Sequence, residues 1–281
     1  MFFRKKNKSQ EKKINKLYKQ EFNSIGLEDL LHYVKLETGI DLFLKKSIIE
    51  TRLKLFCKDK EIYSFSDLLG LVKCKNDLKQ EIINLLTVNE TYFFREERQL
   101  QEAVNFAISR DKSVSILCAP CASGEEVYSL SMMLSEQTDL SNKFTITGVD
   151  INSEAITKAK RGLYTKRSLH KLNENVKNRY FTYKDDMYQI KSEHFLHVNF
   201  RKVNIFEDSF TSIGSFDIIF SRNMFIYFDN TTRLIAMQRF SKLLKRDGRL
   251  LLGHADIVPQ NEWLTKVGFG SSAYYSHPRT N

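Results

Sequence analysis

The stretch CAPCASGEEVYS, residues 118–129, contains residue types that could do chemistry in two different ways. Cys118 and Cys121 have the Cys-x-x-Cys spacing of redox pairs and of half a zinc site. The same stretch passes from an apolar segment through small residues to Gly124 and then to Glu125 and Glu126, as a strand does when it enters a helix at a cofactor loop. The sequence therefore offers either thiol chemistry or ligand binding here.

The remaining sequence argues against thiol chemistry. Cys57 and Cys74 lie in a distant helical region and do not supply the second pair that a structural zinc needs. A reactive redox thiol needs a free helix N-terminus, which two glutamates occupy here. Pro120-Cys121 resembles the catalytic Pro-Cys of cytosine C5 methyltransferases, but those enzymes place it after their fourth strand. We expect Cys118 to be a buried structural thiol and expect no metal.

Ligand binding fits the stretch better. The loop has one glycine, unlike the dinucleotide fingerprint, and two carboxylates at a helix start oppose a pyrophosphate while favouring a cationic or zwitterionic ligand. Asp150 ends the next apolar segment, where an acid binds a ribose diol. A nucleoside with a positive charge and no phosphates describes S-adenosylmethionine. The alternative is that Asp150 or Asn152 caps a helix beginning at Ser153.

The elements that must position these residues change in character near residue 110. Before it, apolar residues recur at i, i+3, i+4 and i+7, which predicts a small helical domain over roughly 20–88. After it, strand-like and helical patterns alternate, which predicts a mostly parallel sheet covered on both faces. The predicted strands are Val114–Cys118, Phe144–Val149, Phe200–Val203, Phe216–Phe220 and Arg249–Gly253. The predicted helices between them are Glu125–Leu134, Ser153–Arg161 and Thr231–Leu244, the last one closed by Gly248.

Two segments stand outside this alternation. Extended runs around Lys184–Asp186 predict a hairpin inserted between the second and third strands. Residues 1–20 hold eight Lys or Arg and one Glu, much of the net charge of +10, and we expect a flexible tail or an acidic partner for it. No apolar run is long enough to span a membrane and no secretory signal is visible. We therefore expect a cytoplasmic protein without membrane insertion.

Four segments together resemble the chemotaxis-receptor glutamate methyltransferases, the CheR family. They are TVNETYFFRE (87–96), ASGEEVYS (122–129), VDINSEAITKAKRGLY (149–164) and FDIIFSRNMFIYFD (216–229) followed by LLKRDGRLLLGHAD. Ala122, Ser123 and Val127 depart from the Ser, Thr and Pro usual in the cofactor loop. The resemblance implies an α/β fold: a helical docking domain over 21–88, then a class I, Rossmann-like methyltransferase domain over 89–281 with a β-subdomain at about 177–198.

The resemblance also implies site residues. Arg95 and Tyr227 would form the methyl-transfer site, and Arg95 would also lie against the cofactor. The remaining cofactor-binding positions would be Asn89, Thr91, Gly124, Glu126, Asp150, Asn204 and Asn223. Lys45, Arg52 and Lys58 would dock the substrate. The cofactor would be S-adenosylmethionine, with S-adenosylhomocysteine as product, and the partners would be methyl-accepting chemotaxis receptors. We expect a monomer that binds no nucleic acid.

Each assignment has a structural alternative. Asn89 or Thr91 could cap a helix beginning near Phe93. Arg95 could pair on the surface with Glu96 or Glu97, and Tyr227 could be an ordinary half-buried aromatic. In the basic segment 44–60, Lys46 and Lys54 could pair with Glu50 at i,i+4, an interpretation we favour for those two lysines but not for Arg52.

The expected chemistry is simple. A glutamate carboxylate is already ionised at pH 7, so methyl transfer to it needs alignment rather than a general base. Arginine can hold a carboxylate through two hydrogen bonds, which is the role we assign to Arg95. One rival interpretation is a class I methyltransferase acting on RNA, although a Pro-Pro-aromatic motif is missing after the fourth strand. The other is a non-catalytic module that binds the cofactor or a receptor. Whether the hairpin binds a receptor C-terminal pentapeptide stays open.

Overall fold

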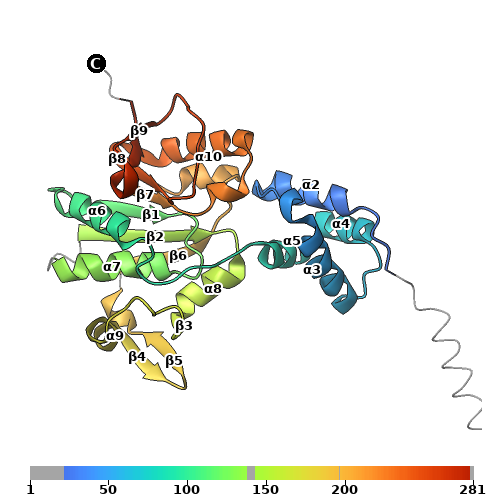
Figure 1. Cartoon of the computed structure of the whole chain (residues 1–281), viewed down its shortest axis with the longest axis horizontal. Coiled ribbons are helices and arrows are strands. Elements are labelled where there is room, and N and C mark those ends of the chain that lie inside the picture. Colours follow the sequence, from blue (N-terminus) through green and yellow to red (C-terminus); the bar gives the residue numbers. More distant parts are fainter. Residues whose placement is uncertain (1–21, 138–142, 196, 279–281) are drawn as a thin grey trace, which may run out of the picture. The chain divides into compact units, whose positions relative to one another are not determined.

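The computed structural model describes residues 22–137, 143–195 and 197–278. The predicted basic tail, residues 1–20, lies outside these ranges. The described residues form two compact units, one made of residues 22–35 together with 42–79, and the other of residues 36–41 and the described residues from 80 to 278 (Figure 1). Within the described ranges, no helix is both long and apolar enough to cross a bilayer.

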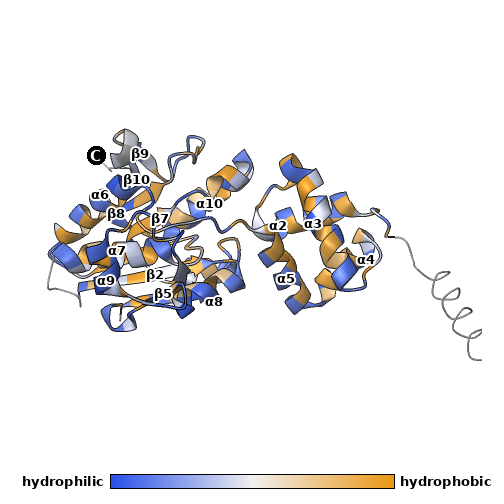
Figure 2. Cartoon of the chain, turned by 60° about the horizontal axis from the view of Figure 1, so that its bottom comes forward, coloured by the Kyte–Doolittle hydropathy of each residue, from blue (hydrophilic) through white to orange (hydrophobic). Residues whose placement is uncertain are grey.

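The first unit is helical, as the apolar spacing predicts. Its helices are α2 (Leu27–Thr38), α3 (Lys46–Asp59), α4 (Phe65–Cys74) and the start of α5 (Asn76–Leu86). Each helix buries its apolar stripe, and the hydropathy colours of Figure 2 alternate along these ribbons accordingly. Ser64 caps α4 because its side chain accepts the Asp67 N–H.

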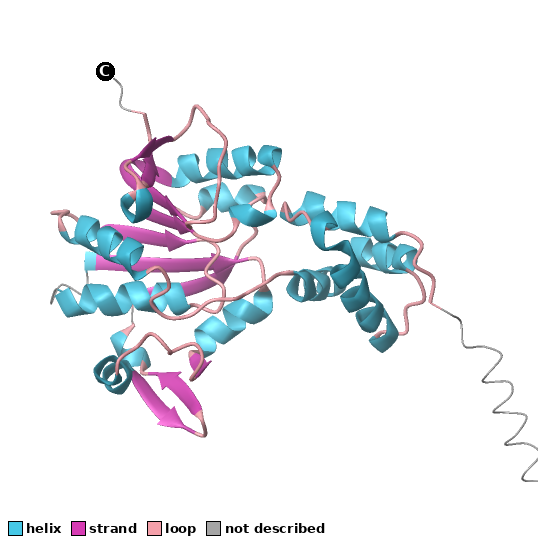
Figure 3. Cartoon of the chain, in the orientation of Figure 1, coloured by secondary structure: helices cyan, strands magenta, loops and turns pink. Residues whose placement is uncertain are grey.

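The second unit contains a seven-stranded sheet in the order β6-β2-β1-β7-β8-β10-β9 (Figure 3). The first five strands in this order, from the edge strand β6 to β8, are parallel, and β10 runs antiparallel to both β8 and β9. The strands are β1 (Val114–Cys118), β2 (Phe144–Asp150), β6 (Val198–Lys202), β7 (Phe216–Ser221), β8 (Leu244–Leu252), β9 (Thr265–Val267) and β10 (Tyr274–Ser276). All five predicted strands are present, whereas β9 and β10 had no clear signal.

Both faces of the parallel part of this sheet are buried, because helices pack on either side and the side chains of each strand alternate between the two faces. In β1, Ile116 belongs to a core with residues of α6 (Glu97–Ile108), α7 (Glu125–Gln137) and α8 (Ser153–Arg161). The adjacent Leu117 belongs to a second core with α10 (Asn230–Leu243). Every residue of β7 is buried, as expected for a central parallel strand. The predicted fold class is confirmed.

The inserted hairpin is also present. β4 (Phe181–Lys184) and β5 (Met187–Ile190) pair antiparallel around Asp185 and Asp186, both with positive φ, as a two-residue hairpin turn requires. The short strand β3 (Leu163–Thr165) pairs with β5 and makes a three-stranded sheet, and α9 (Glu174–Tyr180) lies between β3 and β4 in the chain. Neither β3 nor α9 was predicted, since three to seven residues carry too little periodicity.

One predicted boundary is wrong. Gly248 does not close a helix: α10 ends at Leu243, β8 begins at Leu244, and Gly248 lies inside the strand. The ladder between β7 and β8 shifts register at this point, and a Cβ on Gly248 would lie 3.0 Å from the Asp217 carbonyl oxygen. Close backbone approach, rather than helix termination, therefore requires this glycine.

Candidate active site

The candidate site lies where the sheet changes direction. β1 and β7 are neighbours whose following connections lead to opposite sides of the sheet, and ligands bind at such switch points beyond the carboxyl ends of the strands. The loop after β1 is Ala119–Gly124, and the loop after β7 begins with Arg222 and Asn223. Most of the predicted cofactor residues lie in these loops or in the segment that precedes α6.

Asp150, the last residue of β2, joins the loop after β1 to the residues that follow β2. Its Oδ2 accepts the Ala122 N–H at 2.8 Å, and its Oδ1 accepts the Asn152 N–H at 2.9 Å. Asn152 itself caps α8 by accepting the Ala155 N–H at 2.8 Å, so the capping alternative for Asp150 is wrong. Burial raises the pKa of Asp150 from its ordinary 3.8 to about 6. The backbone N–H donors lower this pKa, but their effect is smaller than that of burial. Each oxygen keeps a lone pair for a further donor such as a ribose hydroxyl.

Gly124 is required by packing. Its φ of +92° is one that side chains rarely adopt, and a Cβ would lie 2.9 Å from the Ala159 Cβ and about as close to the Phe200 ring. These contacts are with the protein's own core. The glycine therefore fixes the path of the loop onto α8 whether or not a ligand also approaches its backbone.

The two glutamates that begin α7 have separate partners. Glu125 accepts hydrogen bonds from the hydroxyls of Ser123 and Ser168. Glu126 lies 3.1 Å from a guanidinium nitrogen of Arg222, whose side chain is only 3% exposed. Burial raises the pKa of Glu126 although the charge of Arg222 opposes the shift.

A buried ionic cluster surrounds Arg222, and sequence analysis missed it. Its guanidinium donates to the Arg95 carbonyl oxygen at 2.6 Å and lies 3.6 Å from the carboxylate of Glu96. The imidazole Nδ1 of His254 lies 2.6 Å from that same carboxylate. Within the described structure, Glu126 Oε1 and Arg222 Nε are buried without a hydrogen-bond partner. Such unsatisfied atoms suit a ligand that carries both an ammonium and a carboxylate group.

Arg95 and Tyr227 lie near each other. The Arg95 guanidinium donates to the Glu90 carbonyl oxygen at 2.9 Å and lies over the Tyr92 ring. Within the described chain Arg95 makes no ion pair, so its predicted alternative pairing with Glu96 or Glu97 is wrong. Burial raises the pKa of Tyr227 above 10, although the nearby charge of Arg95 lowers it. The Tyr227 hydroxyl is therefore protonated at neutral pH and can donate a hydrogen bond.

Asn89 and Thr91 do not cap a helix. The helix that follows them, α6, begins only at Glu97, after Glu96 in the left-handed conformation, and has no side-chain cap. Both residues are partly exposed, and within the described chain their side chains form no hydrogen bond. Their side chains are therefore available to a ligand. If either had capped a helix, its side-chain oxygen would have been occupied by a backbone N–H.

Asn204 and Asn223 are placed differently from each other. The Asn204 amide donates to the Glu37 carbonyl oxygen at 2.7 Å, and its Oδ1 accepts the Phe206 N–H at 3.0 Å, so its side chain is already used within the unit. Asn223 has a φ of +57°, and its backbone N–H donates to Asp256 at 2.5 Å. Asp256 also accepts the backbone N–H of Gly253 at 2.9 Å, which fixes the loop after β8 to the loop after β7.

Two of the missed residues had a usable signal. Arg222 directly follows the apolar strand β7, and Asp256 closely follows β8, so both lie at the carboxyl edge of a parallel sheet. No sequence signal indicated the contact between Glu96 and His254, because these residues lie far apart in the chain.

The cysteines take no part in this chemistry. Cys118 and Cys121 are free and buried, and burial raises the pKa of both thiols, as does the nearby carboxylate of Glu126. A protonated, enclosed thiol is a poor nucleophile and a poor metal ligand.

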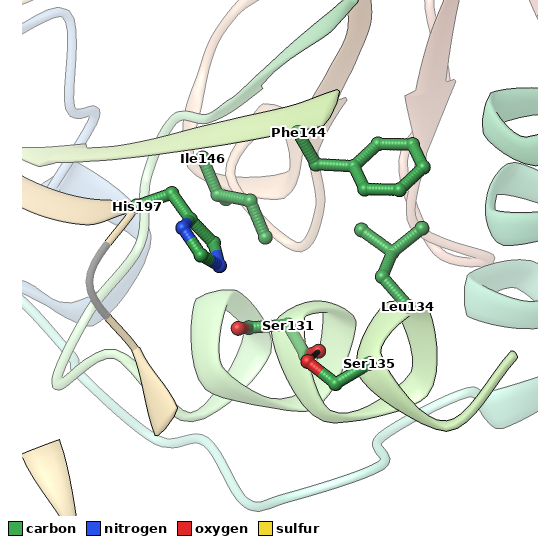
Figure 4. Close-up of a pocket in the computed structure, with 6 residues that line it drawn as sticks. All are labelled: Ser131, Leu134, Ser135, Phe144, Ile146 and His197. Carbon is green, nitrogen blue, oxygen red and sulfur yellow. Dashed lines mark hydrogen bonds between the residues drawn. The ribbon is translucent and has the colours of Figure 1, made fainter. Parts of the chain in front are cut away.

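A small hollow lies elsewhere, near the amino-terminal end of β2 (Figure 4). Its lining is Ser131, Leu134, Ser135, Phe144, Ile146 and His197. Because Phe144 begins β2, this hollow is at the strand end opposite to Asp150 and is separate from the candidate site.

The predicted docking residues lie in the first unit. Lys45, Arg52 and Lys58 are all exposed. Lys54 pairs with Glu50 at 2.7 Å, as its alternative predicted, whereas Lys46 pairs with Glu28 of α2 at 2.5 Å instead of with Glu50.

The sheet order, the acid ending β2 and the acidic start of α7 define a class I S-adenosylmethionine-dependent methyltransferase fold. Residues 89–272 match the family described as "CheR methyltransferase, SAM binding domain". The chain belongs to this family, which confirms the resemblance seen in the sequence.

Relatives named chemotaxis protein methyltransferase match along most of the chain. The protein of Campylobacter jejuni subsp. jejuni serotype O:2 is 41% identical over 90% of this chain and 96% of its own length. That of Borreliella burgdorferi is 31% identical over 86% and 91%. That of Escherichia coli K12 is 31% identical over 75% and 77%. A solved structure of the plantazolicin methyltransferase BpumL with SAH matches weakly, with a TM-score of 0.33 and 20% identity over 56% of this chain and 46% of that one.

Proposed function

We propose that this protein transfers methyl groups from S-adenosylmethionine to glutamate side chains of chemotaxis receptors, in the cytoplasm. The observation that carries the proposal is the placement of Arg95 beside the protonated Tyr227, in the unit that holds the buried acids Asp150 and Glu126. The relatives named chemotaxis protein methyltransferase support the choice of substrate.

The residues present fit this cofactor. Asp150 would accept the ribose hydroxyls with the lone pairs that its backbone donors leave, and the unsatisfied oxygen of Glu126 would accept from the amino group. Asn89, Thr91 and Asn223 would add contacts from their loops, and Asn204 would act by fixing the chain beside the adenine. S-adenosylmethionine supplies, when bound, a methyl group on a positively charged sulfur.

The protein's part in the reaction is then alignment. Arg95 would bind the acceptor carboxylate through parallel hydrogen bonds, and the Tyr227 hydroxyl would donate to the acceptor or hold the cofactor end. Neither residue needs to remove a proton, because the acceptor is ionised at neutral pH. Tyr227 could not act as a base there, since its pKa is raised. Correct placement of two reactants is by itself a large catalytic effect.

The test is label transfer from S-adenosylmethionine with a labelled methyl group to membranes that contain chemoreceptors. We expect label on the receptor that alkali releases, as it does from a carboxyl methyl ester. A receptor whose acceptor glutamates are replaced by alanine should take up no label. Alkali-stable label, label in added RNA, or binding of the cofactor without transfer would contradict the proposal and favour one of the rival interpretations.

A further inference from the structure

The backbone on either side of Arg95 has an unusual conformation. Phe94 has a φ of +57° and Glu96 a φ of +53°, in the left-handed region that residues other than glycine rarely adopt. The Phe94 N–H donates to the Ser129 hydroxyl at 3.0 Å. The Arg95 carbonyl oxygen accepts from Arg222 at 2.6 Å. Because such a conformation persists only where surrounding contacts maintain it, the main chain of Arg95 is fixed in place.

The side chain of Arg95 has fewer contacts than its main chain. Its guanidinium donates to the Glu90 carbonyl oxygen at 2.9 Å and lies over the Tyr92 ring, 5.8 Å from the ring centroid. A single hydrogen bond leaves a planar group free to turn about that bond, whereas an aromatic face beside it favours one orientation. Tyr92 is therefore the contact that restricts the direction in which the other N–H groups of Arg95 point.

Tyr92 packs in turn against a second ring. The centroids of the Tyr92 and His170 rings are 4.7 Å apart, with an angle of 53° between their planes. His170 lies in the turn that follows β3, and its Nδ1 is 2.9 Å from a carbonyl oxygen of the same turn. The next residue of the chain, Phe93, donates its N–H to the Ser168 carbonyl oxygen of this turn at 3.0 Å. The turn and the segment that carries Arg95 are thus joined at two adjacent residues.

We propose that Tyr92 is a positioning residue for methyl transfer, which orients the Arg95 guanidinium toward the acceptor carboxylate, and that His170 supports Tyr92 from the turn after β3. This role rests on the proposed function. Both residues act through Arg95, since two hydrogen bonds to one carboxylate require the planar fork in a single orientation. The ring of Tyr92 rather than its hydroxyl carries the role, because the hydroxyl forms no hydrogen bond with the described residues.

The test measures kcat and KM for methyl transfer to a purified cytoplasmic fragment of a chemoreceptor, together with the cofactor affinity and unfolding midpoint of each full-length variant. Tyr92→Leu removes the ring, and Tyr92→Phe keeps it. His170→Ala and His170→Phe make the same comparison at the second ring, and both lose the hydrogen bond of the imidazole. Tyr274→Leu is the matched control, because Arg249 lies over the Tyr274 ring, 4.4 Å from its centroid, in β8 and β10 and outside the candidate site.

We expect Tyr92→Leu to lower kcat by about tenfold, because a misaligned guanidinium costs alignment in the transition state. The KM for the fragment, the cofactor affinity and the unfolding midpoint should stay near those of the unmodified chain. Tyr92→Phe should restore kcat. His170→Ala should lower kcat by less than Tyr92→Leu does, and His170→Phe should restore it. Tyr274→Leu should leave kcat unchanged.

The sharpest comparison repeats Tyr92→Leu in the Arg95→Ala variant. A residue that acts only through Arg95 has nothing left to position there, so kcat should fall no further. A further tenfold loss would overturn the inference. So would a normal kcat in Tyr92→Leu, no recovery in Tyr92→Phe, an equal loss in Tyr274→Leu, or a weakened cofactor affinity, which would place the ring in the cofactor site.

The unmodified chain separates this inference from the proposed function. If it transfers no methyl group to the fragment, the proposed function is wrong and the positioning role is lost with it. If it is active and Tyr92→Leu is equally active, the positioning role alone is wrong.

Discussion

Two glutamates in this protein lie beside a cation at similar distance and behave oppositely. Glu50 is 2.7 Å from Lys54 on the exposed surface of α3, and this hydrogen bond lowers the pKa of its carboxyl group. Glu126 is 3.1 Å from Arg222, yet burial raises its pKa. The comparison shows that burial, rather than the presence of a cationic partner, decides whether the pKa of a paired carboxyl group is raised or lowered.

The consequence extends to the two regions as wholes. On α3 the charges are hydrated, so their electrostatic effect depends on how many there are and weakens as the salt concentration rises. In the candidate site the charged groups of Glu126 and Arg222 are largely enclosed, so they act through their position, and the loss of one leaves the other unpaired. The predictions below test this contrast, from the largest expected effect to the smallest.

Replacing Arg222 by methionine should destabilise the protein by about 3 kcal/mol or more, because the buried carboxylates of Glu126 and Glu96 lose their shared cation. Lys54→Met, the exposed counterpart, should leave the free energy of unfolding nearly unchanged, because water and salt screen its pair with Glu50. Urea unfolding of both variants measures the difference. Equal losses of unfolding free energy in Arg222→Met and Lys54→Met would contradict the proposed difference between enclosed and exposed ion pairs.

Replacing Arg95 by alanine should lower methyl transfer by about a hundredfold or more while the unfolding midpoint stays near normal, because the guanidinium is partly exposed and makes a single hydrogen bond with the described residues. Arg95→Lys should recover part of the rate, since a lysine keeps the charge without the planar fork. Near-normal turnover by Arg95→Ala would exclude its assigned role.

Cofactor affinity should fall by about tenfold between pH 7 and pH 5, because Asp150 has a pKa of about 6 and loses its charge as pH falls through that value. Stability should respond with the opposite sign. Since the pKa of Asp150 is raised on folding, its contribution is greatest below about pH 4 and is lost as pH rises through 6. Calorimetry on Asp150→Asn provides the control, and a pH dependence that survives this substitution would assign it to another group.

Cys118→Ala and Cys121→Ser should retain activity within a few-fold, because the buried, protonated thiols serve only packing. The stability cost should be about 1 kcal/mol each. Loss of methyl transfer in a variant that remains folded would show that a cysteine of the Cys-x-x-Cys has a functional role in the site.

The sequence predicted the site best where the signal was local. Asp150 and Glu126 could be found because each adjoins a strand end or a helix start, and strand ends follow from apolar runs. Asn152 and Asp150 could not be told apart as caps, since both stand before Ser153 and only the direction of each side chain separates them. The role of Gly248 was mistaken, and the packing role of Gly124 was not foreseen, because the atoms that would meet a Cβ at either position come from other elements.

By itself, the sequence determined the order of the five parallel strands and of the helices α7, α8 and α10 between them, the switch point and its loops, and the residues available there, because periodicity and strand length are local properties. Only the tertiary structure decided which charges are buried. It placed Arg222 between Glu126 and Glu96, brought Arg95 near Tyr227, and left Ile48 and Leu55 exposed on α3. Burial depends on residues far apart in the chain, and it is burial that raises the pKa of Asp150 and Glu126 at the site.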